Sequence, residues 1–220
     1  MIAIDVLSSL TPTVEEQDTV RLLARAVDAA GDVVEDAPIV WEVVDTPPVG
    51  FTVDSATGLV QAFAPGSGRV QARVETLASG LIRVTVTPAP DSVSAAVAED
   101  TLALGQAASP PVSAAVWDLT TSPGEQLALA GKPVHFELVD PQPGTAAAAA
   151  VFLTPGDTVP GADPHHVAAT TEADGSAGIV VRRVTGAAQP DSAIMHAYAL
   201  TARGDTVPGS PVRLVVQIEN

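Results

Sequence analysis

Two histidines and one tyrosine occupy positions from which their rings would meet on a single surface. His135 lies between two apolar residues, and His196 and Tyr198 alternate with alanine and methionine in the same way. This alternation is typical of half-buried strands, so all three side chains are expected on the outer face of a sheet. If the two segments are neighbouring strands, the rings are cross-strand neighbours. Two interpretations stay open, namely a weak metal or glycan platform and a cross-strand cluster without a ligand.

Trp117 is a candidate contact residue for a different reason. Its alternation with Val116 and Asp118 places the indole on the outer face of a predicted strand. A large aromatic side chain on the outside must be covered by something or bind something. We expect the loop at 119–130 to fold over it, while a contact between domains or between subunits stays open.

The segment Arg203-Gly204-Asp205 spells the integrin-recognition tripeptide and is expected in the last hairpin of the chain. However, the hexapeptide Gly-Asp-Thr-Val-Pro-Gly occurs at 156–161 and again at 204–209. The second copy supplies the Gly-Asp by itself, and Val-Pro-Gly suits a type II turn. Integrin binding and a simple turn motif therefore remain alternatives, and we expect the turn.

No metal site is predicted. The segment Asp163-Pro164-His165-His166 offers two imidazoles, but a zinc site needs three or four converging ligands. Calcium is the one possible cofactor, since Asp28, Asp118 and Asp174 begin turns between predicted strands, and acids near the domain junction (Asp91, Glu99 and Asp100) could contribute oxygens. A calcium ion needs six to eight oxygen ligands, and no Asp-x-Asp spacing supplies them here. We therefore expect no cofactor.

Catalytic motifs are also missing from the sequence. There is no Gly-x-Ser-x-Gly elbow, no His-Glu-x-x-His pair and no glycine loop that would cradle a phosphate before a helix. No catalytic residue is predicted, and the chain is not expected to be an enzyme.

Composition narrows the class of partner. The 220 residues carry 26 acidic and 10 basic side chains, for a formal net charge of −16, and contain no cysteine. Such a chain is repelled by phosphate backbones and by anionic lipid, so nucleic acid is not an expected partner. No apolar run approaches the roughly 20 residues of a membrane span, and the first residues do not form a signal peptide. If the protein is exported, we expect its signal or lipid anchor to be absent from this sequence.

Alternation of apolar and polar residues recurs along the chain between turns rich in proline and glycine, and no helix is predicted. The segment Thr87-Pro88-Ala89-Pro90-Asp91 forms a stiff extended linker. We therefore predict an all-β chain of two antiparallel sandwich domains, residues 1–88 and 89–220, since such domains take about 100 residues. The second domain carries a long loop insertion at about 139–166, in which the alanine run is expected as one helical turn or a strand.

Both domains resemble known families. Thr19-Val20-Arg21-Leu22, Ile39-Val40-Trp41-Glu42 and Gly58-Leu59-Val60-Gln61-Ala62 occur in the order found in bacterial Ig-like group 2 domains. Val116-Trp117-Asp118 and Gly131-Lys132-Pro133-Val134-His135-Phe136 resemble the group 1, or invasin-type, domain. The resemblance implies tandem immunoglobulin-like folds with no shared active site.

These observations together predict a non-catalytic structural or adhesive module of a bacterial surface or secreted protein, located outside the cell. Its expected partner is another protein or a glycan on a surface, or copies of itself. Three alternatives stay open: a self-assembling subunit of a surface fibre or array, accessory domains of a secreted enzyme, and a phage virion decoration protein. Fold alone does not separate these functions.

Overall fold

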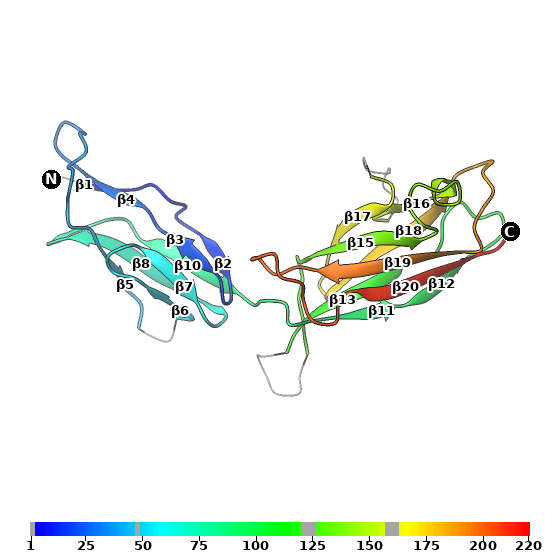
Figure 1. Ribbon diagram of the computed structural model, residues 1–220. Coiled ribbons are helices and arrows are strands. Elements are labelled where there is room, and N and C mark those ends of the chain that lie inside the picture. Colours follow the sequence, from blue (N-terminus) through cyan, green and yellow to red (C-terminus); the bar gives the residue numbers. More distant parts are fainter. Residues whose placement is uncertain (1–2, 47–48, 120–125, 157–162) are drawn as a thin grey trace. The chain divides into compact units, whose positions relative to one another are not determined.

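The computed structural model describes residues 3–46, 49–119, 126–156 and 163–220, and these are mostly β-strand. The chain divides into two compact units, Met1–Ala89 and Pro90–Asn220, called unit 1 and unit 2 below (Figure 1). Within the described ranges, no helix is long and apolar enough to cross a membrane. The prediction of an all-β chain is therefore confirmed.

Unit 1 has one continuous sheet and a second layer in two parts. The continuous sheet has the order β2-β10-β8-β5, with β9 beside β8, and the second layer consists of β1-β4 and β3-β7-β6. The strands are β1 (Ala3–Val6), β2 (Thr13–Glu15), β3 (Thr19–Arg21), β4 (Ala24–Val27), β5 (Val40–Val43), β6 (Phe51–Val53), β7 (Leu59–Ala62), β8 (Gly66–Val74), β9 (Leu77–Ala78) and β10 (Ile82–Thr87).

The core of unit 1 follows from the alternation seen in the sequence. In β8 and β10 every second side chain is buried, and Val70, Ile82 and Val84 are completely shielded from solvent. Trp41 on β5 is 5% exposed and packs in the same cluster, as expected for a core tryptophan. Leu22 lies in the break between β3 and β4, and its amide donates to the carbonyl of Gly58. The two parts of the second layer meet at this point.

Unit 2 consists of two five-stranded sheets. One has the order β11-β13-β18-β16, with β14 beside β13, and the other has the order β12-β20-β19-β15-β17. The strands are β11 (Ser92–Val97), β12 (Glu99–Leu102), β13 (Val112–Asp118), β14 (Leu127–Ala128), β15 (Pro133–Asp140), β16 (Val151–Thr154), β17 (His166–Thr170), β18 (Ser176–Arg183), β19 (Ser192–Ala199) and β20 (Val212–Ile218). Phe136, Leu138, Met195 and Leu214 are fully buried between the sheets.

Much of the expected loop insertion at 139–166 belongs to the sandwich itself. The alanine run ends in a 3-10 turn, η1 (Ala148–Ala150), and β16 follows it directly and pairs with β18. Ala148, Ala150 and Leu153 are fully buried. The small side chains of the two alanines allow the turn to pack directly on the core. The expectation of one helical turn in the alanine run is therefore confirmed, whereas β16, which follows it, was not predicted. Residues 157–162 lie outside the described part of the chain.

Both units share one path of the chain. In each unit the first strand pairs antiparallel with a strand of one sheet (β1 with β4, β11 with β13). The second strand then pairs parallel with the last strand of the unit, in the other sheet (β2 with β10, β12 with β20). This switch of the first segment from one sheet to the other identifies two immunoglobulin-like β-sandwiches in tandem.

Candidate functional site

Strands β15 and β19 lie side by side in unit 2 and bring together the three ring residues singled out above. Val134, Phe136 and Leu138 on β15 are fully buried, so His135 projects from the opposite, outer face. His135 is paired with Tyr198, and Glu137 is paired with His196. The predicted cross-strand arrangement is confirmed, whereas a binding role for these residues stays a prediction.

His166 on β17, which the sequence did not single out with these three, stacks on His135 from the other side of β15 in the sheet. The rings of His135 and Tyr198 are stacked with centroids 5.3 Å apart, and those of His135 and His166 are stacked at 5.5 Å. His166 Nε2 lies 3.2 Å from the hydroxyl oxygen of Tyr198, within hydrogen-bonding distance. His135, His166 and Tyr198 are called the ring cluster below. Their flat, partly exposed surface is the kind of platform on which a sugar ring or another planar group can stack.

The environment of His135 disfavours its charged form. Burial against its neighbours, followed by the nearby imidazole of His166, lowers the pKa of His135. Its Nδ1 atom is buried and has no hydrogen-bond partner within the described residues. A proton on this ring would therefore be poorly solvated and close to a second imidazole.

The pKa shift of His135 predicts a pH-dependent stability for unit 2. The unfolded chain takes up this proton at a pH of about 6.5, whereas the folded unit resists it. The contribution of His135 to the free energy of unfolding is therefore fully present above about pH 6.5 and declines as the pH falls toward the lowered pKa. Urea unfolding between pH 5 and 8 should show this decline in the wild type and a flatter profile in His135→Phe.

The control for this prediction is His196→Gln, because His196 lies outside the ring cluster and its removal leaves the three stacked rings in place. We expect the decline caused by His135 to persist in His196→Gln. The carboxyl of Asp174, whose pKa is lowered by the amide and hydroxyl of Ser176, titrates in a more acidic range and does not overlap. Equal slopes for wild type and His135→Phe would contradict the role of His135.

Histidine and carboxylate side chains gather beside the ring cluster. His166, Glu137 and His196 follow one another across β17, β15 and β19. Even so, the described residues contain no group of three histidine or carboxylate side chains arranged to hold a metal ion. What the ring cluster offers a ligand is a stacking surface.

Trp117 lies half-buried on the outer face of β13, between two neighbouring strands. Its indole Nε1 donates to the hydroxyl of Ser94 at 3.0 Å, and β14 pairs alongside it through Ala128. The described part of the expected covering loop is thus a short added strand beside the indole. Residues 120–125 of that loop lie outside the described ranges. The polar end of the tryptophan is satisfied within unit 2.

Arg203, Gly204 and Asp205 form an exposed turn between β19 and β20. The turn is closed by bonds from the amide of Thr201 to the carbonyl of Asp205 and from the amide of Gly204 to the carbonyl of Thr201. Next along the chain, Val207 is buried. The repeated hexapeptide therefore has a packing role here, and its first copy lies almost wholly outside the described residues. Integrin recognition by the tripeptide stays an untested prediction.

The two histidines of Asp163-Pro164-His165-His166 serve different parts of unit 2. His165 Nε2 contacts the carbonyl of Ala148 in η1 at 3.0 Å, while the next residue begins β17 and joins the ring cluster. Sequence reasoning placed His166 in a polar loop and so missed it. The alternation of His166, Ala168 and Thr170 with buried or half-buried neighbours was the available signal.

No protein-family model and no curated protein matches the chain. Among solved structures it is similar to the Yersinia pseudotuberculosis adhesin InvE, at 16% identity over 99% of this chain with a TM-score of 0.38, and it spans 59% of the length of that structure. It is also similar to the D00-D0 domain of Intimin, at 14% identity over 99% of this chain and 97% of that one, TM-score 0.31. The Clostridium thermocellum CbhA fibronectin(III)-like modules are 11% identical over 98% of this chain and 94% of theirs, TM-score 0.41. The fold assignment rests on the strand pairing of the chain itself.

Proposed function

We propose that the chain is a non-catalytic structural or adhesive module of a bacterial surface or secreted protein, acting outside the cell as a spacer or stalk. In this proposal unit 1 is a group 2-like and unit 2 a group 1-like bacterial Ig domain. The outer face that carries the ring cluster is the proposed contact surface for a protein or a glycan. The observation that supports this function best is the path of the chain through each unit.

In unit 2 the chain enters at one end of the sandwich and leaves at the other. Near the entry, the amide of Val93 donates to the carbonyl of Pro208, which precedes β20. Near the exit, the amide of Glu219, which follows β20, donates to the carbonyl of Leu102. Entry and exit therefore lie at opposite ends of β20. Unit 1 has the same arrangement, since β1 lies against β9, just before the start of β10, whereas the end of β10 pairs with β2.

This path determines how the unit responds to tension. Because β12 and β20 are parallel and are continuous with opposite ends of the unit, pulling on the ends slides one strand along the other. The hydrogen bonds between them must then break together rather than one after another. A domain that passes tension along its length in this way suits a spacer between a surface and a binding site.

A proline in β12 tests this proposal. The amides of Val215 and Glu219 bond to the carbonyls of Ala98 and Leu102, so Asp100 also directs its backbone toward β20. Asp100→Pro removes the amide of Asp100, and with it one hydrogen bond to β20, at a cost of about 1 kcal/mol in the free energy of unfolding. In single-molecule force spectroscopy, with the chain held at its two ends, the unfolding force of unit 2 should fall clearly in this variant.

The matched control is Thr101→Pro, one residue further along β12. The amide of Thr101 donates to the side chain of Asp100 rather than to β20, so the bonds between the two strands stay intact. We expect the control to unfold near the wild-type force, provided that both variants lose similar amounts of equilibrium stability. Equal unfolding forces for Asp100→Pro and the wild type would contradict a mechanical role for the β12–β20 pair.

A further inference from the structure

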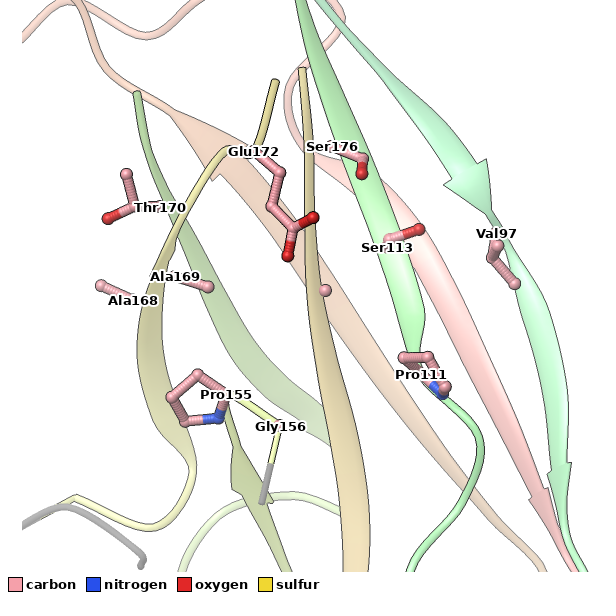
Figure 2. A pocket seen from close by; sticks show the side chains of 11 residues that line it. Val97, Pro111, Ser113, Pro155, Gly156, Ala168, Ala169, Thr170, Glu172 and Ser176 are labelled. Carbon is pink, nitrogen blue, oxygen red and sulfur yellow. The ribbon is translucent and has the colours of Figure 1, made fainter. Parts of the chain in front are cut away.

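A groove opens in unit 2 between β17 and β18, at the edge where the two sheets separate. Its volume is about 560 Å³ (Figure 2). Ala168 and Thr170 line one side, Ser113, Ser176 and Gly178 line the other, and Pro155 closes one end. The side chains along the walls are small, so the backbone of another polypeptide segment can approach closely.

The β17 side of the groove is a free strand edge. The amide of Leu138 donates to the carbonyl of His165, and the amide of Thr171 donates to the carbonyl of Lys132. Because directly bonded pairs alternate along antiparallel strands, Val167 and Ala169 also face β15. Ala168 and Thr170 therefore direct their N–H and C=O groups away from β15 and toward the groove. Such an edge is a template for pairing with an added strand.

The β18 side is open as well. The amide of Val116 donates to the carbonyl of Gly175, so by the same alternation Gly178 faces away from β13. On that side β16 reaches only as far as the Thr154–Val180 pair. The backbone of Gly178 has no hydrogen-bond partner among the described residues. Counting only partners among the described residues, both walls of the groove thus carry unpaired main-chain groups.

Electrostatics indicates what kind of segment fits. Figure 2 shows the side chain of Glu172 pointing into the middle of the groove, and no basic residue lines it. The Glu172 carboxylate has no ion pair or hydrogen bond within the described part of the chain. The whole chain carries a net charge of −16, which attracts cationic segments and repels a second copy.

We propose that this groove binds an extended, positively charged peptide segment of a partner protein, which adds as a strand to the free edge of β17 and places a lysine or arginine side chain against Glu172. The main-chain bonds supply affinity without sequence preference, and Glu172 supplies the preference for charge. The inference does not depend on the mechanical role proposed above, because it concerns only the edge of unit 2.

The probe is a capped decapeptide of alternating valine and lysine, titrated into the ¹⁵N-labelled full chain. We expect chemical-shift changes concentrated at residues 166–178 and an affinity that falls as salt is added. The same peptide with glutamate in place of lysine should not bind measurably. Shift changes centred elsewhere, or equal binding of the two peptides, would overturn the proposal.

Ala168→Pro removes the amide that the added strand would use. That amide faces away from β15, so the pairing of β17 within the sheet is preserved, and proline is tolerated on edge strands. Binding should weaken about tenfold, whereas Ala168→Thr, which keeps the amide, should bind as the wild type does.

Glu172→Gln is the second variant, and it keeps the backbone unchanged. It should weaken binding of the lysine peptide and reduce the effect of salt. Unchanged affinity in both Ala168→Pro and Glu172→Gln, with spectra that show intact folding, would rule the site out. Concentration-dependent dimerisation that Ala168→Pro abolishes would replace the peptide partner with a second copy of the chain and likewise overturn the proposal.

Discussion

Phe136→Ala is expected to remove about 3–5 kcal/mol from the free energy of unfolding of unit 2 and to leave unit 1 unchanged. Phe136 is fully buried on β15, at the centre of the cluster that holds the two sheets of unit 2 together. Truncation removes the apolar contacts of the ring and leaves a cavity that the sandwich closes only partly. The core of unit 1 shares no residue with this cluster.

The chain provides its own reporters for this measurement. Its only two tryptophans are divided between the units, Trp41 in unit 1 and Trp117 in unit 2. Urea unfolding followed by fluorescence in Trp41→Phe and Trp117→Phe backgrounds therefore separates the two transitions. Phe136→Leu keeps most of the apolar volume and should cost less than Phe136→Ala. A common shift of both transitions would show that the two cores are not independent.

Gly58→Ala should strongly destabilise unit 1. Gly58 has a φ of +70°, and a Cβ at this position would lie 2.6 Å from Nε1 of Trp41 and 2.7 Å from the carbonyl oxygen of Leu22. The left-handed backbone costs about 1–2 kcal/mol for an L-residue, and overpacking of the core costs about 1–3 kcal/mol more. Both effects weaken the contact between Leu22 and Gly58, which joins the two parts of the second layer.

Gly31→Ala is the matched control in the same unit. Gly31 has a φ of +88°, but a Cβ there would meet nothing within 4 Å. Only the backbone cost should appear, so Gly31→Ala should lose about 1–2 kcal/mol of stability. Chemical unfolding monitored by Trp41 fluorescence measures both variants. If Gly58→Ala and Gly31→Ala lower the free energy of unfolding by the same amount, the close packing of Trp41 against Gly58 is not what stabilises this region.

The sequence was sufficient to predict the regular strands because their side chains alternate over many residues. Val134, Phe136 and Leu138 on β15 show this pattern, and it also placed the rings of His135 and Tyr198 correctly. Pairing of β15 with β19 then follows from the sandwich topology. These predictions needed only local periodicity and knowledge of which strands are neighbours.

The missed features depend on contacts that local patterns do not encode. β16 is four residues long and follows an alanine run, so its pattern was too short to distinguish a strand from a loop. His166 follows Asp163-Pro164, which is typical of a turn, and it joins the ring cluster only because β17 pairs with β15. The groove beside β17 exists because β16 ends before Gly178, which no periodicity predicts.

The measurement that tests the account most directly is the force–extension curve of the wild-type chain held at its two ends. We expect two separate unfolding events, with released lengths in proportion to the sizes of Met1–Ala89 and Pro90–Asn220. Each event should begin with a distinct force peak, because the parallel pairs β2–β10 and β12–β20 must be sheared. A single event that releases the whole chain, or extension without force peaks, would contradict the proposal of a tandem spacer that carries tension from end to end.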